Sequence, residues 1–275
     1  MGIFVKRIEL NSTDIFYEDN GTGYPVVLVH GMGSDHTVWQ GIIPLLKDNY
    51  RVLALDLRGH GHSMKTPGPY TMELFSHDIY QFLESLNIDQ AHFIGHSMGG
   101  SILLELALQH PGKIRSLTLI SSFAFVDQPL KEIFLNLDKI LEYQGFDQFF
   151  DACIKLTYTS QFQLDNQESF REIREKMGET SSIPILRDTL TLCLDVNLID
   201  YLEGIEIPTL IIAGEKDNFT PSLHGKKIQM NLPQADIEII KGLGHNLLVE
   251  KPEKIFPIIN RFLKVQKLPP GLGGE

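Results

Sequence analysis

One serine, one aspartate and one histidine in this sequence have the residue types and the order of a nucleophile, an acid and a base. Ser97 lies at the centre of a Gly-x-Ser-x-Gly pattern, and Asp217 and His245 follow it along the chain. A serine hydroxyl is a weak nucleophile at neutral pH, so it needs a base to accept its proton and an acidic group to orient that base. We therefore predict that Ser97, Asp217 and His245 act together in nucleophilic catalysis.

The residues around Ser97 predict a strand that turns sharply into a helix. An apolar run, residues 91–94, precedes the turn, and residues 101–108 have the apolar spacing of a helix. Gly95 and Gly99 have no Cβ, which allows the backbone to fold tightly around the serine. A helix that begins here also presents free N–H groups and a partial positive charge, which favour a developing oxyanion.

Asp217 has two rivals as the acid. Glu215 lies two residues earlier, and Asp127 lies closer to the end of an earlier apolar run. We favour Asp217 because residues 218–221 continue its loop before the next helix. The chain has ten histidines, and His245 is distinguished by its position directly after the last predicted strand.

An oxyanion needs two backbone donors, and the sequence offers one on each side of the nucleophile. The first is the N–H of Met98, directly after Ser97, and the second is the N–H of Met32, in the loop that follows residues 25–29. Methionine side chains usually pack in cores, which is compatible with a role for their amides. We also expect the following residues to contact the substrate: Gly31, Trp39, Phe123 and Leu247.

Apolar runs alternate with segments of helical spacing, which predicts an α/β fold with a mostly parallel central sheet flanked by helices. The expected strands cover residues 25–29, 51–55, 91–94, 116–120, 208–213 and 237–240, with an antiparallel edge hairpin at 3–10 and 13–19. The expected helices cover residues 36–47, 72–86, 101–108, 222–231 and 252–265. In such sheets the site lies beyond the carboxyl ends of the strands. His30, Asp56, Ser97 and Ser121 all fall at those ends.

The pattern changes between residues 123 and 201, where helical segments replace buried strands. They cover residues 130–143, 146–156, 166–177 and 185–194. Because this stretch leaves one strand and returns before the next, we predict a helical cap at 123–201 over a core made of 1–122 and 202–268. Its phenylalanines suggest an apolar acyl pocket, although most such side chains pack a cap onto its core. Residues 269–275 are expected to be a flexible tail.

Composition and charge exclude several classes of partner. The chain has 275 residues, of which 24 are Lys or Arg and 35 are Asp or Glu, for a net charge of −11. This charge disfavours nucleic acid and anionic membranes, both of which attract basic surfaces. The sequence has no apolar run of membrane-spanning length and no signal-peptide pattern, so we expect a cytoplasmic protein, monomeric or homodimeric, that acts on a small molecule.

No pattern in the sequence predicts a metal or an organic cofactor. Cys153 and Cys193 are not part of a Cys-x-x-Cys pattern, and we expect free thiols, although a disulfide between them stays open. His60 and His62 alternate on one loop without a third ligand, and we expect that loop to be structural. The glycines form neither dinucleotide-binding nor phosphate-binding loops.

Five motifs together resemble the α/β-hydrolase superfamily over nearly the whole chain. They are His30-Gly31-Met32-Gly33, Asp56-x-Arg58-Gly59-His60-Gly61-x-Ser63, Gly95-His96-Ser97-Met98-Gly99-Gly100, Gly214-x-x-Asp217 and Gly244-His245. The resemblance implies an α/β-hydrolase fold with an inserted helical cap. It also implies a cofactor-free mechanism, in which Ser97 attacks a carbonyl and forms an acyl-enzyme that water then releases.

Within that superfamily the chain is similar to small, capped bacterial enzymes. These include carboxylesterases, enol-lactonases, C–C bond hydrolases and cofactor-free haloperoxidase-like enzymes. The C–C hydrolases tend to have a tryptophan after the catalytic histidine, whereas Asn246 follows His245 here. We therefore expect hydrolysis of a carboxylic ester or lactone. The alternatives are a C–C bond hydrolase, a perhydrolase or lyase with the same triad, and a ligand receptor with little turnover.

Overall fold

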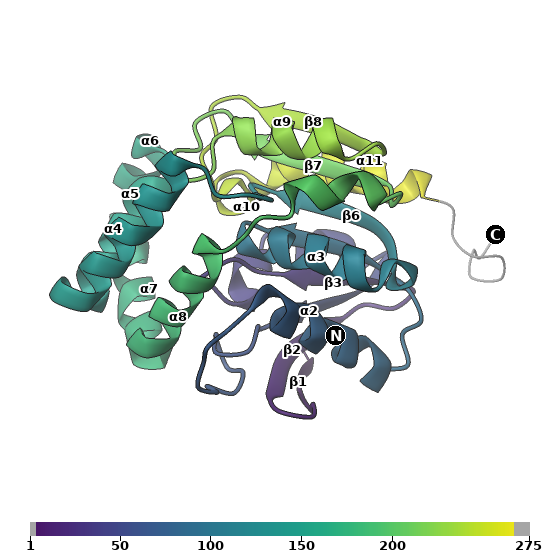
Figure 1. The fold of residues 1–275 in the computed structure, drawn as a ribbon, viewed down its shortest axis with the longest axis horizontal. Helices are drawn as coiled ribbons and strands as arrows, with labels where there is room; N and C mark the ends of the chain where they lie inside the picture. Colours follow the sequence, from purple (N-terminus) through teal and green to yellow (C-terminus); the bar gives the residue numbers. More distant parts are fainter. Residues whose placement is uncertain (1–3, 267–275) are drawn as a thin grey trace.

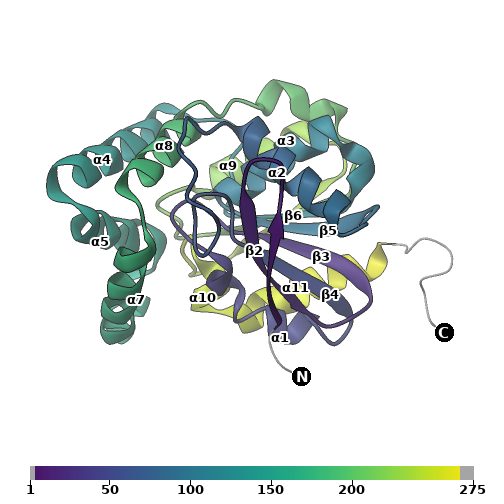
Figure 2. The ribbon, with the colours of Figure 1, turned by 90° about the horizontal axis from the view of Figure 1, so that it is seen from below.

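The computed structural model describes residues 4–266, which form one eight-stranded sheet in the order β1-β2-β4-β3-β5-β6-β7-β8 (Figure 1). The strands are β1 (Phe4–Glu9), β2 (Asp14–Asn20), β3 (Tyr24–Val29), β4 (Tyr50–Leu55), β5 (Ala91–His96), β6 (Ile114–Ile120), β7 (Thr209–Gly214) and β8 (Ala235–Ile240). β2 runs antiparallel to β1 and β4, and the other neighbours are parallel. The predicted mostly parallel sheet is therefore confirmed, with β1 and β2 as a hairpin at its edge (Figure 2).

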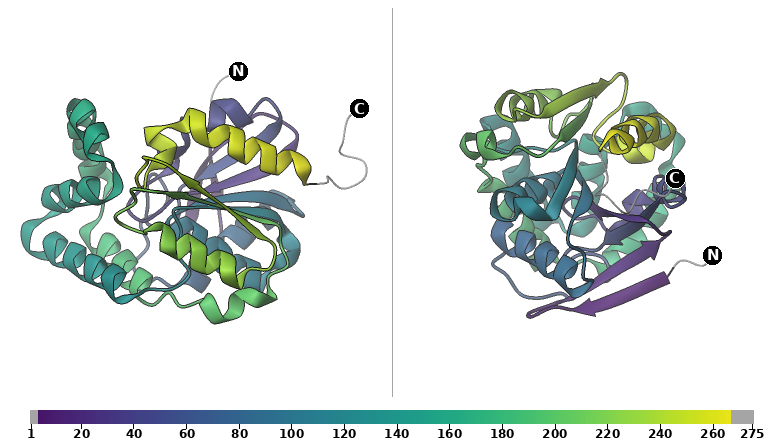
Figure 3. Two further views of the ribbon diagram at one scale, coloured as in Figure 1. Left: turned by 90° about the horizontal axis from the view of Figure 1, so that it is seen from above. Right: turned by 90° about the vertical axis from the view of Figure 1, so that its right-hand side faces the viewer.

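The strand residues alternate between two apolar cores, because successive side chains of a strand point to opposite faces of the sheet. Val27 and Val29 belong to a core with helices α2 (Met72–Ser85), α3 (Met98–Gln109) and α9 (Ser222–Asn231). Val26 and Leu28 belong to a core with α1 (Ile43–Leu46), α10 (Leu247–Glu250) and α11 (Pro252–Val265). Figure 3 shows α9 and α11 on opposite sides of the strands. Burial on both faces accounts for the continuous apolar runs.

Five helices lie between β6 and β7, in the stretch that we interpret as a cap. They are α4 (Gln128–Gln144), α5 (Phe146–Thr157), α6 (Ser160–Asp165), α7 (Gln167–Thr180) and α8 (Ile183–Leu194). The two ends of this stretch meet, because the N–H of Leu198 donates to the carbonyl of Ala124 at 2.7 Å and Phe125 forms a β-bridge with Asn197. The helices stand beside one end of the sheet (Figures 1 and 2).

The structure departs from the predicted elements mainly at short helices. The expected helix at 36–47 is two pieces, a 3₁₀ turn at His36–Trp39 and α1. Gly41 lies between them, where a Cβ would come within 2.9 Å of the Pro252 side chain. The helices α6 and α10 were not predicted, because four to six residues carry too little periodicity. None of the helices within residues 4–266 combines the length and apolar composition needed to cross a bilayer, and the predicted tail at 269–275 lies outside the described residues.

Candidate active site

Ser97 lies in a sharp turn between β5 and α3. Its φ of +53° and ψ of −122° are unusual for a residue with a side chain. The turn is tightly packed, because a Cβ on Gly99 would come within 2.2 Å of the Val29 carbonyl oxygen. A Cβ on Gly31 would come within 3.0 Å of the Ser97 Cβ. The loop that follows β3 therefore lies directly against the serine.

His245 and Asp217 form a buried pair. The Nδ1 of His245 donates to Oδ2 of Asp217 at 2.8 Å, and the Asp217 side chain has no exposed surface. Oδ1 of Asp217 accepts the backbone N–H groups of Phe219 and Thr220, each at 2.8 Å. Burial by itself raises the pKa of Asp217, but the attraction of His245 and these hydrogen bonds outweigh it and hold the pKa below the ordinary value. The carboxylate is therefore ionised at neutral pH.

The two rival acids have other partners. Oε2 of Glu215 accepts the N–H of Gly242 at 2.9 Å. Asp127 caps α4 by accepting the N–H of Leu130, and its carboxylate lies 3.7 Å from Nε2 of His224. Among these three carboxylates, the described structure joins only Asp217 to His245.

The backbone of His245 is held beside the Ser97 turn. Its carbonyl oxygen accepts from Nε2 of His96 at 3.2 Å and from the hydroxyl of Ser121 at 2.9 Å. Thr220 donates its hydroxyl to the carbonyl of Ser121 at 2.8 Å, which ties the loops after β6 and β7 together. Within residues 4–266 no hydrogen bond joins His245 to the Ser97 hydroxyl. Such bonds are often long before substrate binds.

Sequence reasoning did not assign Ser121, Thr220 or His96 any role. Ser121 has a φ of +49°, so it is a second strained residue at the end of a central strand. Its position directly after β6 was the signal in the sequence that could have indicated a role near the site. Nothing in the sequence indicates which backbone carbonyl its hydroxyl contacts.

The two proposed oxyanion donors flank Ser97. Met98 is the first residue of α3, so its N–H has no acceptor within the helix. Met32 follows Gly31, the residue that contacts Ser97, and its half-buried side chain packs against the apolar core. Both amides therefore belong to segments in contact with the serine.

The four expected substrate contacts lie in different surroundings. Gly31 is against Ser97. Trp39 and Leu247 are fully buried in the core that contains α11, and Phe123 is 1% exposed with its ring 5.8 Å from that of Phe134. In this conformation these three side chains pack against other core residues, and their contact with a substrate stays a prediction.

A small cavity lies between the cap and the loop of Met32. Its volume is about 20 Å³. It is lined on the core side by residues 33–35 and 59–61, and on the cap side by Met177, Leu186 and residues 180–182. The cavity marks where the α7–α8 turn faces the loop that carries a proposed oxyanion donor.

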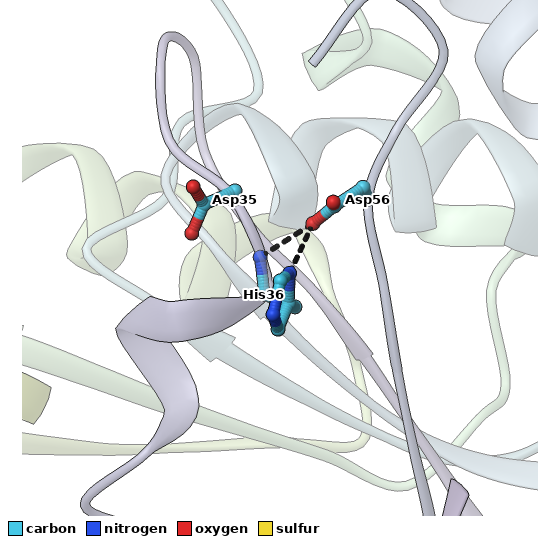
Figure 4. Close-up of side chains that lie close together, drawn as sticks. All are labelled: Asp35, His36 and Asp56. Atoms are coloured by element: carbon cyan, nitrogen blue, oxygen red, sulfur yellow. Dashed lines mark hydrogen bonds and ion pairs between the residues drawn. The ribbon is translucent and has the colours of Figure 1, made fainter. Parts of the chain in front are cut away.

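The cluster of Asp35, His36 and Asp56 has metal-like spacing (Figure 4). However, Oδ1 of Asp56 accepts from both the backbone N–H and Nδ1 of His36 at 2.7 Å, and Oδ2 accepts the N–H of His62 at 2.7 Å. These donors occupy the carboxylate, which therefore joins two loops as a brace. Burial lowers the pKa of His36, but Asp56 outweighs that effect and raises it above the ordinary value.

Arg58 also has a structural role, in the loop that follows β4. Arg58 donates to both oxygens of Asp78 at 2.6 Å, and both side chains are buried. Cys153 and Cys193 are free thiols. Burial raises the pKa of Cys153 to about 12, which leaves a poor nucleophile at neutral pH.

Comparison with known proteins places these features in a family. Residues 24–252 match the model of the alpha/beta hydrolase fold. A 3-oxoadipate enol-lactonase of Acinetobacter baylyi is 28% identical over 239 residues, covering 87% of this chain and 88% of the relative. A non-heme chloroperoxidase, CPO-A1, of Kitasatospora aureofaciens is 28% identical over 263 residues, covering 89% and 93%.

The solved structures agree with the fold. The crystal structure of the enol-lactonase from Burkholderia xenovorans LB400 superposes with a TM-score of 0.88 at 24% identity, covering 94% of this chain and all of that one. At this identity the likeness shows the fold alone. Together with the family model, it shows that the chain belongs to the α/β hydrolase family.

Proposed function

We propose that the chain is a serine hydrolase that cleaves carboxylic esters or lactones through Ser97, His245 and Asp217. The observation that carries the proposal is the buried His245–Asp217 pair, 2.8 Å apart, whose histidine backbone is bonded to the residue preceding Ser97. An imidazole that is oriented by an ionised carboxylate is the arrangement that removes a proton from a serine.

The geometry supports a separate role for each nitrogen of His245. Nδ1 donates to Asp217, so the lone pair of Nε2 is available to accept the proton of the Ser97 hydroxyl. Ser97 Oγ then bonds to the carbonyl carbon, and the imidazolium is stabilised by the Asp217 carboxylate. His245 next gives its proton to the leaving alkoxide. Water, deprotonated by the same nitrogen, releases the acid and restores Ser97.

The N–H groups of Met98 and Met32 would bind the oxygen that becomes negative. Met98 supports this because the N-terminus of α3 adds a partial positive charge at that point. Losing one such donor costs on the order of a hundredfold or more in rate. The contact between Gly31 and Ser97 supports the position of the second donor.

Two alternative activities use the same residues. The similarity to an enol-lactonase favours a lactone or ester as substrate. The similarity to a chloroperoxidase favours a perhydrolase, in which hydrogen peroxide attacks the acyl-enzyme in place of water and yields a peracid. Product analysis with and without hydrogen peroxide separates these two outcomes.

Hydrolysis of short p-nitrophenyl esters and a panel of lactones tests the proposal. We expect wild type to turn over a member of the panel and Ser97→Ala to lose that activity. Ser85→Ala, on the exposed end of α2, is the matched control and should behave as wild type. Equal activity in wild type and Ser97→Ala would overturn the proposal. Labelling of Ser97 by a fluorophosphonate without turnover would instead favour a receptor.

A further inference from the structure

Three hydrogen bonds join a turn of the cap to the helix that follows His245. The turn is the connection between α5 and α6. The N–H of Asn246 donates to the carbonyl of Thr157 at 2.9 Å. Oε1 of Glu250 accepts the N–H of Thr159 at 2.9 Å, and Oε2 accepts the Thr159 hydroxyl at 2.8 Å. Residues 91 positions apart in the chain are thus linked through both carboxylate oxygens.

The Glu250 side chain is enclosed at this contact. The residue is 6% exposed, and the described residues place no Lys or Arg within ion-pair distance of its carboxylate. A buried carboxylate is costly unless hydrogen bonds satisfy it. The two donors of Thr159 supply those bonds, so the position of the turn and the position of Glu250 depend on each other.

The backbone directly before His245 is pressed onto the same contact. A Cβ on Gly244 would lie 2.8 Å from Oε1 of Glu250 and 3.1 Å from the Thr157 carbonyl oxygen. The residues on both sides of His245 therefore touch the cap turn or its carboxylate partner.

A second cap helix is connected to the His245 ring through one intervening side chain, that of Phe219. The ring centroid of Phe134, on α4, lies 5.6 Å from the ring centroid of Phe219, and the angle between the two ring planes is 83°. The Phe219 ring lies 5.0 Å from the His245 imidazole at 84°. Because the backbone of Phe219 also donates to Asp217, two separate cap segments contact residues that themselves adjoin the His245–Asp217 pair.

We propose that Glu250 is a positioning residue, which with Thr159 holds the cap turn 157–159 against the loop of His245. Through this contact the cap and the imidazole are set in place together. The consequence for catalysis rests on the proposed function of His245. The contact itself, between Glu250 and Thr159, does not.

Variants at Thr159 test the contact with little change in volume. Thr159→Val removes the hydroxyl donor, and Thr159→Ser keeps it. We expect Thr159→Val to lower kcat by about tenfold, with KM changed less than twofold, because a displaced base slows chemistry more than binding. Thr159→Ser should restore kcat. The matched control is Thr191→Val, an exposed cap threonine whose hydroxyl bonds only to its own helix.

Glu250→Ala and Glu250→Gln complete the series. Glu250→Gln retains one acceptor oxygen, so we expect its kcat to lie between those of wild type and Glu250→Ala. This variant also remains informative if Glu250→Ala does not fold. Hydrogen exchange at the amides of Thr159 and Asn246 reports on the contact independently of turnover. We expect at least tenfold faster exchange at both amides in Glu250→Ala and Glu250→Gln than in wild type.

The two readouts separate failure of this proposal from failure of the proposed function. If wild type hydrolyses no ester or lactone, the rate of Ser97 labelling by a fluorophosphonate replaces kcat, and exchange is measured unchanged. Unaltered exchange in the Glu250 variants would overturn the contact. Faster exchange with unaltered kcat or labelling would overturn the positioning role.

Discussion

The hydroxyl of Ser121 donates to the carbonyl oxygen of His245 at 2.9 Å, from a backbone whose φ is +49°. A residue with a side chain rarely adopts this conformation, which costs on the order of 1–3 kcal/mol. The N–H of Ser121 also donates to the carbonyl of Ile212 at 2.8 Å, on the neighbouring strand. Ser121 therefore links the central sheet to the loop of the proposed base.

We expect Ser121→Ala to lower kcat by roughly fivefold, because the variant loses one hydrogen bond of about 1 kcal/mol to the His245 carbonyl. Steady-state kinetics on the best ester of the panel measure this change. Ser122→Ala is the comparison, because the Ser122 hydroxyl bonds to Ile120 and not to His245. A larger loss of kcat in Ser122→Ala than in Ser121→Ala would contradict the prediction.

Asp217→Asn should reduce kcat by about 10⁴-fold while leaving the fold intact, since an amide cannot stabilise the imidazolium. The same assay, with circular dichroism to verify folding, measures the effect. Glu215→Gln is the matched control, and we expect less than about a twofold change because its carboxylate accepts the N–H of Gly242 and, among residues 4–266, makes no bond to His245. If Glu215→Gln proved the more damaging, Asp217 would not be the acid.

Asp78→Asn should destabilise the protein by about 3–5 kcal/mol, because it leaves the buried guanidinium of Arg58 without its charged partner. Urea unfolding at neutral pH measures the free energy of unfolding. The double variant Arg58→Met/Asp78→Leu removes both charges and should cost less than Asp78→Asn alone. If the double variant were less stable than Asp78→Asn, the cost of that single variant would not come from an uncompensated buried charge on Arg58.

His36 should stabilise the fold more in acid than in alkali. Its pKa is raised above 6.5 by Asp56, and the carboxylate of Glu18 lies 3.6 Å from its Nε2 with Asp35 beside it. A raised folded-state pKa gives stability that is complete below the unfolded value and is lost as the pH rises through the folded value.

The difference in unfolding free energy between wild type and His36→Asn should accordingly be larger at about pH 5.5 than at about pH 8.5. His77→Asn, on an exposed helical position, controls for general histidine effects. A difference that grew with pH would mean that the neutral form of His36 is the favoured one.

The sequence predicts the central strands β3 to β7 well, because they are buried on both faces and read as apolar runs. Ser97 follows such a run, whereas β8, which precedes His245, is only partly buried and has an alternating apolar and polar pattern. Trp39 and Leu247 were expected at the substrate, and in the structure both are buried in one core with Ile42 and Ile43. Cytoplasmic location, oligomeric state and the four substrate contacts stay predictions.

The parts that sequence reasoning missed depend on contacts between distant segments. Glu250 lies on a four-residue helix with too few residues to show a period, and its partner Thr159 lies in another helix connection. Ser121 was placed at a strand end, but the direction of its hydroxyl follows from how the loops after β6, β7 and β8 meet. Such pairings are set by tertiary packing and leave no local pattern.

The hydrogen-bonded joint between Ala124 and Leu198 bears on how this protein could acquire a new substrate specificity. The chain leaves the core at Ala124 and returns at Leu198, and a hydrogen bond of 2.7 Å joins these two residues. The number of residues between them can therefore change without moving the strands of the sheet. A transplanted cap would have to close that joint, offer Glu250 two donors and Asn246 one acceptor, and pack an apolar side chain against Phe219. The rest of the stretch between residues 125 and 197 makes none of these contacts, so we expect recognition to diversify there while the proposed chemistry is retained.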